Sequence, residues 1–249
     1  MGASRLMPTQ VIIGWDTEYQ EVDPDGLGRA NPLRFKGAPK RLGHRTKDWL
    51  AREKFNEVLA YSVCVLDPET GEYTSSALMA TSVSKDGLSE YADWRKRLSL
   101  FRLVGAALAG AVGAGILPRD PEGYQITLAA HFSAADLPGL RDFEELTQTR
   151  KRYIHAIRKT YVTLELPAKK TIRIPGIGHR VPVSVRLVDT MLWSPATHRS
   201  IAKIGDTLGL PKIELPKGAI SNMRDLKMSD PDLFEAYAIR DAEVAAITR

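Results

Sequence analysis

The chain has 249 residues, 43% hydrophobic and 26% charged, which suits one large or two small domains and excludes a disordered or low-complexity polypeptide. Its 35 Lys and Arg residues against 30 Asp and Glu residues give a formal net charge of +5. The single cysteine, Cys64, excludes an internal disulfide and a cysteine-rich zinc site. A reducing, cytoplasmic location is therefore expected.

No segment of the sequence predicts membrane association. Residues 1–10 lack the basic-then-apolar pattern of a signal peptide. The longest uncharged stretch, residues 103–117, contains four glycines and is shorter than the roughly 20 residues that a membrane-spanning helix needs. It favours a buried helix that lies close to its neighbours, and no membrane partner is expected.

The first half of the chain predicts three strands and then helix. Residues 11–15 are a short apolar run, typical of a strand buried on both faces. After a polar segment rich in Pro and Gly, residues 58–66 and 73–79 flank a turn and predict a hairpin. Residues 88–114 favour one or two helices.

The second half predicts strand and helix in alternation. Residues 124–130 form a central strand that leads into a helix near Asp136, and residues 161–187 predict a protruding hairpin ahead of a strand at 185–189. A helix at 200–208 ends at Gly209. The last helix starts at 229–231 with no evident C-cap, which suggests a domain excised from a longer protein or a stand-alone relative. We expect one α/β domain, residues 1–249, with a mixed sheet and insertions at about 23–54 and 150–186.

Two carboxylates share one face of the first strand. Because side chains alternate along a strand, Asp16 and Glu18 point the same way. Like charges on a buried strand repel and are costly to desolvate, and a divalent cation relieves both costs. The alternative is that the strand simply emerges into solvent there.

Further candidates lie on the last helix and after the central strand. Tyr237 and Asp241, four residues apart, share a helix face that is otherwise apolar; alternatively, Tyr237 fills the core and Asp241 forms a salt bridge. Asp136 lies where open α/β sheets bind ligands, at the carboxyl end of a strand, or else caps its helix. Asp189 is expected to be structural rather than a further ligand.

These motifs occur in one order along the chain: Asp16, Glu18, Asp136, Tyr237 and Asp241. The set resembles the DEDD superfamily of 3′–5′ exonucleases, and most closely the proofreading domains of family B DNA polymerases. The resemblance runs from Val11 to about Ala246. A related subtype carries His where this chain has Ala236, so the tyrosine subtype (DEDDy) is favoured. It implies a ribonuclease H-like mixed sheet flanked by helices, with a β-hairpin inserted between the second and third motifs.

The resemblance also implies a mechanism. Two Mg²⁺ or Mn²⁺ ions, about 3.5–4 Å apart, would stabilise the attacking and leaving oxygens of a phosphodiester. By similarity, Asp16 would bridge both ions, Glu18 and Asp241 would complete one, and Asp136 would hold the other. Tyr237 would orient the attacking water. Nucleoside 5′-monophosphates would leave the 3′ end of single-stranded DNA, in proofreading or end-trimming, and a polymerase or other domain beyond the C-terminus is an expected partner.

The chain departs from the family at two positions, where His131 replaces an Asn and Ala135 replaces an aromatic residue. The polymerase signatures are absent from this sequence. Two other readings stay open: a nucleic-acid-binding or scaffolding domain that cleaves weakly, and an RNase with the same site.

Two basic runs favour contact with a nucleic-acid backbone. Residues 150–186 hold ten Lys or Arg residues and one acid, and residues 29–54 hold nine against two. The alternative for each run is a solvated surface. The residues expected to bind nucleic acid are Thr17, His131, Arg150, Lys151, Arg152, Lys169 and Lys170.

Overall fold

The computed structural model describes residues 7–20, 57–80, 89–92, 96–148, 154–157, 161–164, 167–192, 194 and 200–248. The predicted insertion at 23–54 lies outside the described residues, as do three of the candidate nucleic-acid contacts, Arg150, Lys151 and Arg152.

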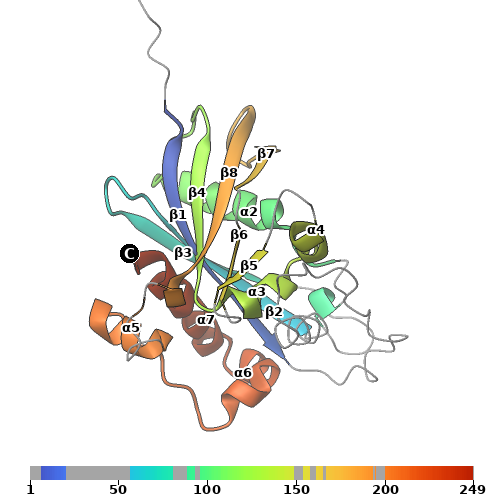
Figure 1. The fold of residues 1–249 in the computed structure, drawn as a ribbon. Helices are drawn as coiled ribbons and strands as arrows, with labels where there is room; N and C mark the ends of the chain where they lie inside the picture. Colours follow the sequence, from blue (N-terminus) through green and yellow to red (C-terminus); the bar gives the residue numbers. More distant parts are fainter. Residues whose placement is uncertain are drawn as a thin grey trace, which may run out of the picture.

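A six-stranded mixed sheet forms the centre of the fold, in the order β3-β2-β1-β4-β8-β7 (Figure 1). Strands β1, β4 and β8 are mutually parallel, whereas β2, β3 and β7 run antiparallel to their neighbours. The predicted α/β class with a mixed sheet is confirmed, and it is compatible with a ribonuclease H-like domain. The six strands are β1 (Thr9–Gln20), β2 (Glu57–Leu66), β3 (Tyr73–Met79), β4 (Tyr124–Ala130), β7 (Ala168–Arg173) and β8 (Arg180–Asp189).

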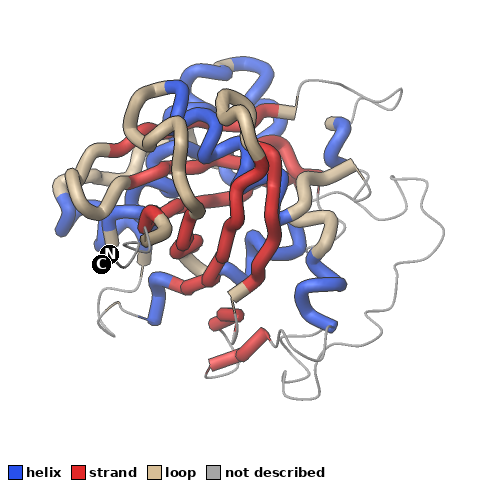
Figure 2. Tube along the Cα trace, turned by 90° about the horizontal axis from the view of Figure 1, so that it is seen from above, coloured by secondary structure: helices blue, strands red, loops and turns tan. Residues whose placement is uncertain are grey.

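Helices cover both faces of the sheet at β1, with α2 (Leu100–Gly113) on one side and α7 (Pro231–Ile247) on the other. Val11, Ile13 and Trp15 are buried in the main core with α2. The opposite face of β1 packs against α7. Figure 2 shows the strands running through the middle of the molecule with helices around them. The two faces of β1 therefore serve different purposes: one supports the main core, and the other meets the last helix.

Two hairpins occupy the region where the sequence predicts one. The strand expected at 185–189 begins at Arg180, and it pairs with β7 inside the main sheet. The second hairpin, β5 (Ile154–Ile157) and β6 (Tyr161–Leu164), is a separate two-stranded sheet, seen apart from the main one in Figure 2. Strand β6 contacts β8 and α3 (Ser133–Asp136). The predicted inserted hairpin is thus split into one unit within the sheet and one beside it.

The remaining helices are short, apart from α7. The helix expected from Asp136 begins three residues earlier and continues as a 3₁₀ turn, with Pro138 in its first turn. None of the helices in the described ranges has the length and apolar character needed to cross a membrane. The other elements are η2 (Glu90–Ala92), η3 (Leu137–Gly139), α4 (Phe143–Gln148), η4 (Thr190–Leu192), α5 (Ile201–Leu208), η5 (Ala219–Asn222) and α6 (Met223–Ser229).

Candidate functional site

The last helix is seated directly on the first strand at Gly14. A Cβ atom at this position would collide with the carbonyl oxygen of Ala242 and with Ala246. Glycine therefore allows the backbones of β1 and α7 to approach more closely than any other residue would. This close approach brings Asp241 on α7 next to Asp16 and Glu18 at the carboxyl end of β1.

Three carboxylates converge at this junction. Asp16, Glu18 and Asp241 each offer an oxygen, and the three oxygens lie within 4.8 Å of one another. Glu18 and Asp241 are buried and Asp16 is partly buried. One oxygen of Asp241, Oδ1, is buried and has no hydrogen-bond partner among the described residues. Three acids at this distance form a donor set that hard divalent cations prefer.

Asp136 is a fourth buried carboxylate at the edge of this cluster. Its Oδ1 accepts a 3.0 Å hydrogen bond from the backbone N–H of Thr17, which lies between the two acids of β1. Its Oδ2 is buried without a partner in the described part of the chain. Asp136 ends α3 and makes no capping bond there, so the helix-cap alternative is not supported.

Burial raises the pKa values of all four acids, and repulsion from neighbouring carboxylates adds to this effect at Asp16, Glu18 and Asp136. Burial, with the neighbouring Asp241 carboxylate, raises the pKa of Asp16 to about 7. Burial and the charge of Asp16 raise the pKa values of Glu18 and Asp136 well above their ordinary ranges. Burial also raises the pKa of Asp241, against the opposing effect of Lys212. The cluster thus holds more negative charge than its protein surroundings compensate.

Asp189, at the end of β8, contrasts with Asp136 although both follow central strands. Its carboxylate accepts hydrogen bonds of 3.0–3.1 Å from the backbone N–H groups of Phe132, Ser133 and Met191, and from the Ser133 hydroxyl. Phe132 has a positive φ of 68°, which is uncommon outside glycine. Asp189 therefore fixes the strained turn that carries Asp136, in agreement with its predicted structural role.

Tyr237 and Lys212 complete the site from α7 and from the segment after α5. Lys212 Nζ lies 2.8 Å from Asp241 Oδ2 and 4.7 Å from the centre of the Tyr237 ring. Although burial opposes its charge, Asp241 raises the pKa of Lys212 above its ordinary value. Burial raises the pKa of Tyr237 to about 12, so its phenol is neutral near pH 7. Sequence reasoning missed Lys212, because it lies outside any periodic element.

The other residues predicted to contact nucleic acid lie in different parts of the structure. Thr17 is buried beside Asp136, and His131 Nδ1 lies 3.0 Å from the Thr190 hydroxyl at the same edge of the sheet. Lys169 and Lys170, adjacent in β7, pair with Ser184 and Val183, which face opposite sides of the sheet. Lys170 Nζ lies over the Phe101 ring of α2, 5.6 Å from its centre. The two lysines therefore do not belong to one surface.

Comparison with known proteins gives one distant relation. No protein-family model matches the chain. The primer-independent DNA polymerase PolB of Escherichia coli is 25% identical over 202 residues, which cover 76% of this chain. The match covers 22% of that polymerase, so the chain spans about a fifth of its length. The similarity relates this chain to part of a DNA polymerase.

Proposed function

We propose that the chain is a metal-dependent 3′–5′ exonuclease that hydrolyses phosphodiester bonds at the 3′ end of DNA. The observation that carries the proposal is the convergence of Asp16, Glu18 and Asp241 within 4.8 Å, with Asp136 hydrogen-bonded to the strand between the first two. Four acids that are buried or partly buried and that lie in one another's electrostatic field are unfavourable in an apolar setting. Such a cluster is expected where cations and phosphates bind.

The donor set fits Mg²⁺ or Mn²⁺. All four candidate ligands are carboxylates, and buried oxygens of Asp136 and Asp241 have no partner among the described residues. Asp16, Glu18 and Asp241 would hold one ion, and Asp16 with Asp136 a second. When bound, such ions supply Lewis-acid stabilisation of charge on phosphate oxygens and lower the pKa of bound water.

The remaining side chains would position the substrate and the water. Tyr237 is a neutral phenol beside the cluster and can orient a water by hydrogen bonding without adding another negative charge. Lys212 fixes Asp241 and lies against the Tyr237 ring, so it holds these two groups in register. Its ammonium also places positive charge next to the position where a phosphate would gain negative charge.

Two other observations support removal from the 3′ end and the choice of DNA as the substrate. The order of the motifs resembles the DEDDy exonucleases, which remove nucleotides from the 3′ end and release nucleoside 5′-monophosphates. The similarity to a DNA polymerase favours DNA over RNA as the substrate. Proofreading or end-trimming is the role that agrees with both.

The test uses a 5′-labelled single strand of DNA with Mg²⁺ or Mn²⁺. The wild-type chain is expected to give a ladder that shortens from the 3′ end, and Asp16→Asn is expected to give none. Glu235→Gln, an exposed acid on the same helix as Tyr237, is the matched control and should cleave normally. Cleavage of RNA alone would change the substrate, and salt-sensitive binding without cleavage under either metal would contradict the proposal.

A further inference from the structure

Four cations line one face of the β7–β8 hairpin. Lys169 pairs with Ser184 across the hairpin, and Arg173 pairs with Arg180, so these side chains share a face. Arg186, two residues beyond Ser184, points the same way because side chains alternate along a strand. All four cations are exposed. We call this surface the β7–β8 basic face.

The basic face lies on the same side of the sheet as the carboxylate cluster. Ser184 is in register with Gln125 of β4, and Gln125 with Gln10 of β1. Gln10 shares its side of β1 with Gly14 and Asp16, at even spacing along the strand. On this side of β4 and β8, Gln125 and Arg186 are exposed and Thr127 and Ser184 are partly exposed, whereas Ala129, nearer the cluster, is buried.

The opposite side of the hairpin is a normal buried face. Val181, Val183 and Val185 are buried in the main core with α2, and Lys170 points toward Phe101 on that side. Strands with parallel neighbours are usually covered on both faces. The exposure of the basic face is therefore unusual for this part of a sheet, and its cations have no acid beside them on β7 or β8.

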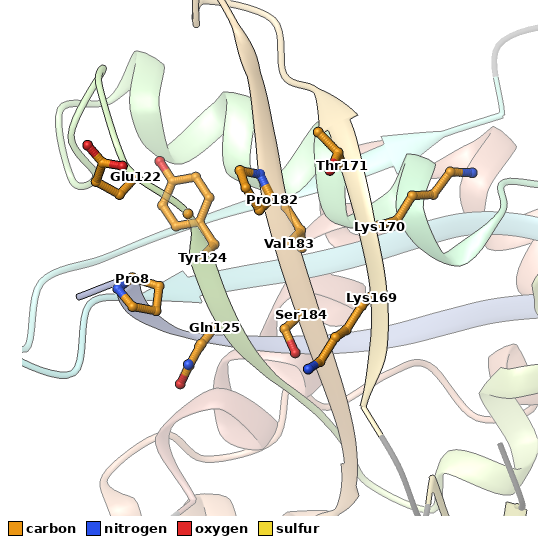
Figure 3. A pocket seen from close by; sticks show the side chains of 11 residues that line it. Pro8, Glu122, Tyr124, Gln125, Lys169, Lys170, Thr171, Pro182, Val183 and Ser184 are labelled. Carbon is orange, nitrogen blue, oxygen red and sulfur yellow. The ribbon is translucent and has the colours of Figure 1, made fainter. Parts of the chain in front are cut away.

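A hollow of about 780 Å³ lies at the start of this surface. Its floor includes a row of three polar side chains in register, Gln125, Ser184 and Lys169, shown side by side across β4, β8 and β7 in Figure 3. Glu122 stands at the rim, in the segment before β4. Amide, hydroxyl and ammonium groups on a flat floor can hydrogen-bond phosphate and sugar oxygens without reading bases.

We propose that the β7–β8 basic face binds the phosphodiester backbone of a nucleic acid upstream of its 3′ end, while that end occupies the carboxylate cluster. The proposal rests on the proposed exonuclease function for the direction of the strand. The sign of the charge selects the occupant: four cations without neighbouring acids on these strands favour a polyanion. Position also supports it, because β8 runs from Arg180 to Asp189, which fixes the turn that carries Asp136.

The length of β8 makes the proposal quantitative. The nine steps from Arg180 to Asp189 span about 30 Å at roughly 3.3 Å per residue. A stacked strand carries one phosphate per about 3.4 Å, so about nine nucleotides separate the 3′ end from Arg180. By the same spacing, an oligonucleotide of about 4 nucleotides would reach no further than Arg186, at the near end of the basic face, and one of about 16 would cover the whole face.

The experiment measures binding of 5′-fluorescent single-stranded DNA in EDTA, so that cleavage plays no part. The test variant replaces Lys169, Arg173, Arg180 and Arg186 with Gln. One matched control exchanges Lys and Arg at the same four positions and keeps the charge. A second control removes four exposed cations from α2 and the segments around it, with the same change in net charge: Lys96→Gln, Arg102→Gln, Arg119→Gln and Arg141→Gln.

For the wild type and both controls, affinity should rise between about 4 and 16 nucleotides and fall steeply with salt. In the test variant the gain with length should disappear, and the slope of log K against log[salt] should decrease by about 3, as expected for four lost contacts to a single strand. Equal salt slopes for the test variant and wild type, or an equal loss in the α2 control, would overturn the proposal.

Cleavage separates this proposal from the proposed function. With Mg²⁺ or Mn²⁺, the test variant should still trim an oligonucleotide of about 4 nucleotides at the wild-type rate, because it leaves the carboxylates intact. If no variant cleaves but the long strand still binds through the basic face, the exonuclease proposal fails and the binding face stands. If short and long strands are trimmed equally by the test variant, the face has no role in binding substrate.

Discussion

Two aspartates at the same edge of the sheet, Asp189 and Asp136, differ in how fully their carboxylates are hydrogen-bonded. Asp189 is buried, and its carboxylate accepts three hydrogen bonds from the turn after β4 and a fourth from the backbone N–H of Met191. Asp136, on that turn, keeps one oxygen without a partner among the described residues and lies beside two more acids. The first arrangement stabilises the fold. The arrangement at Asp136 destabilises the fold in the absence of a cation. Buried carboxylates without compensating partners are expected at functional sites.

The largest effect should come from removing one acid of the cluster. Asp16→Asn is expected to reduce cleavage by about 10³-fold or more, because each 1.36 kcal/mol of lost transition-state stabilisation costs a factor of about ten. In EDTA its melting temperature should equal or exceed that of the wild type, since one repelling charge is gone. Steady-state cleavage and a thermal melt check both. A large loss of stability would place Asp16 with Asp189 as a structural residue.

The reverse pattern is expected at Asp189. Replacing it with Ala leaves the N–H groups of Phe132 and Ser133 without their acceptor, which should destabilise the protein by about 2–5 kcal/mol at about 1–3 kcal/mol for each unsatisfied donor. For a chain of this size, that corresponds to a drop in melting temperature of about 2–4 °C per kcal/mol. Chemical denaturation measures it. A stable variant with abolished cleavage would contradict the structural role and indicate direct participation in catalysis.

Lys212 should have an intermediate effect on activity. Lys212→Gln removes the ion pair with Asp241 and the contact with the Tyr237 ring, and we expect kcat to fall about 10–10²-fold, as for loss of a group that positions others. Because Lys212 and Tyr237 act together, adding Tyr237→Phe should cost less than the product of the two single effects. Independent, multiplicative effects would show that the two residues do not cooperate.

The last effect is a pH dependence of the metal-free protein. The pKa of Asp16 is about 7 in the folded chain, against 3.8 as its ordinary value. The folded state therefore binds this proton more tightly, so the stabilisation is complete below about pH 4 and is lost as the pH rises through 7. In EDTA, the melting temperature of Asp16→Asn should rise relative to wild type between pH 5 and 8. A constant difference across this range would mean that Asp16 does not titrate there.

Local patterns in the sequence were sufficient to predict many of the residues at this edge of the sheet. The spacings of two on β1 and four on α7 place Asp16 with Glu18 and Tyr237 with Asp241, because each pair lies within one regular element. The mixed sheet and the structural role of Asp189 were predicted as well. That the separate acidic motifs meet depends on Gly14, where α7 can approach β1.

Other features depend on contacts that no local pattern contains. Lys212 lies in an irregular segment, and only tertiary packing brings it to Asp241. The basic run at 150–186 was predicted to contact a nucleic-acid backbone, but no local pattern shows that the pairing of β7 with β8 directs Lys169 and Lys170 to opposite sides of the sheet. Strands β7 and β8 also belong to the main sheet instead of forming a protruding hairpin, and they pair as far as Arg173 and Arg180.

Counting bound Mn²⁺ ions shows whether the carboxylate cluster is a divalent-metal centre. A titration followed by electron paramagnetic resonance would compare the wild type with Asp16→Asn, Asp136→Asn and the exposed control Glu235→Gln. We expect two ions for the wild type and the control, one for Asp136→Asn and a large loss of binding for Asp16→Asn. Equal binding by all four proteins, or none by the wild type, would contradict it.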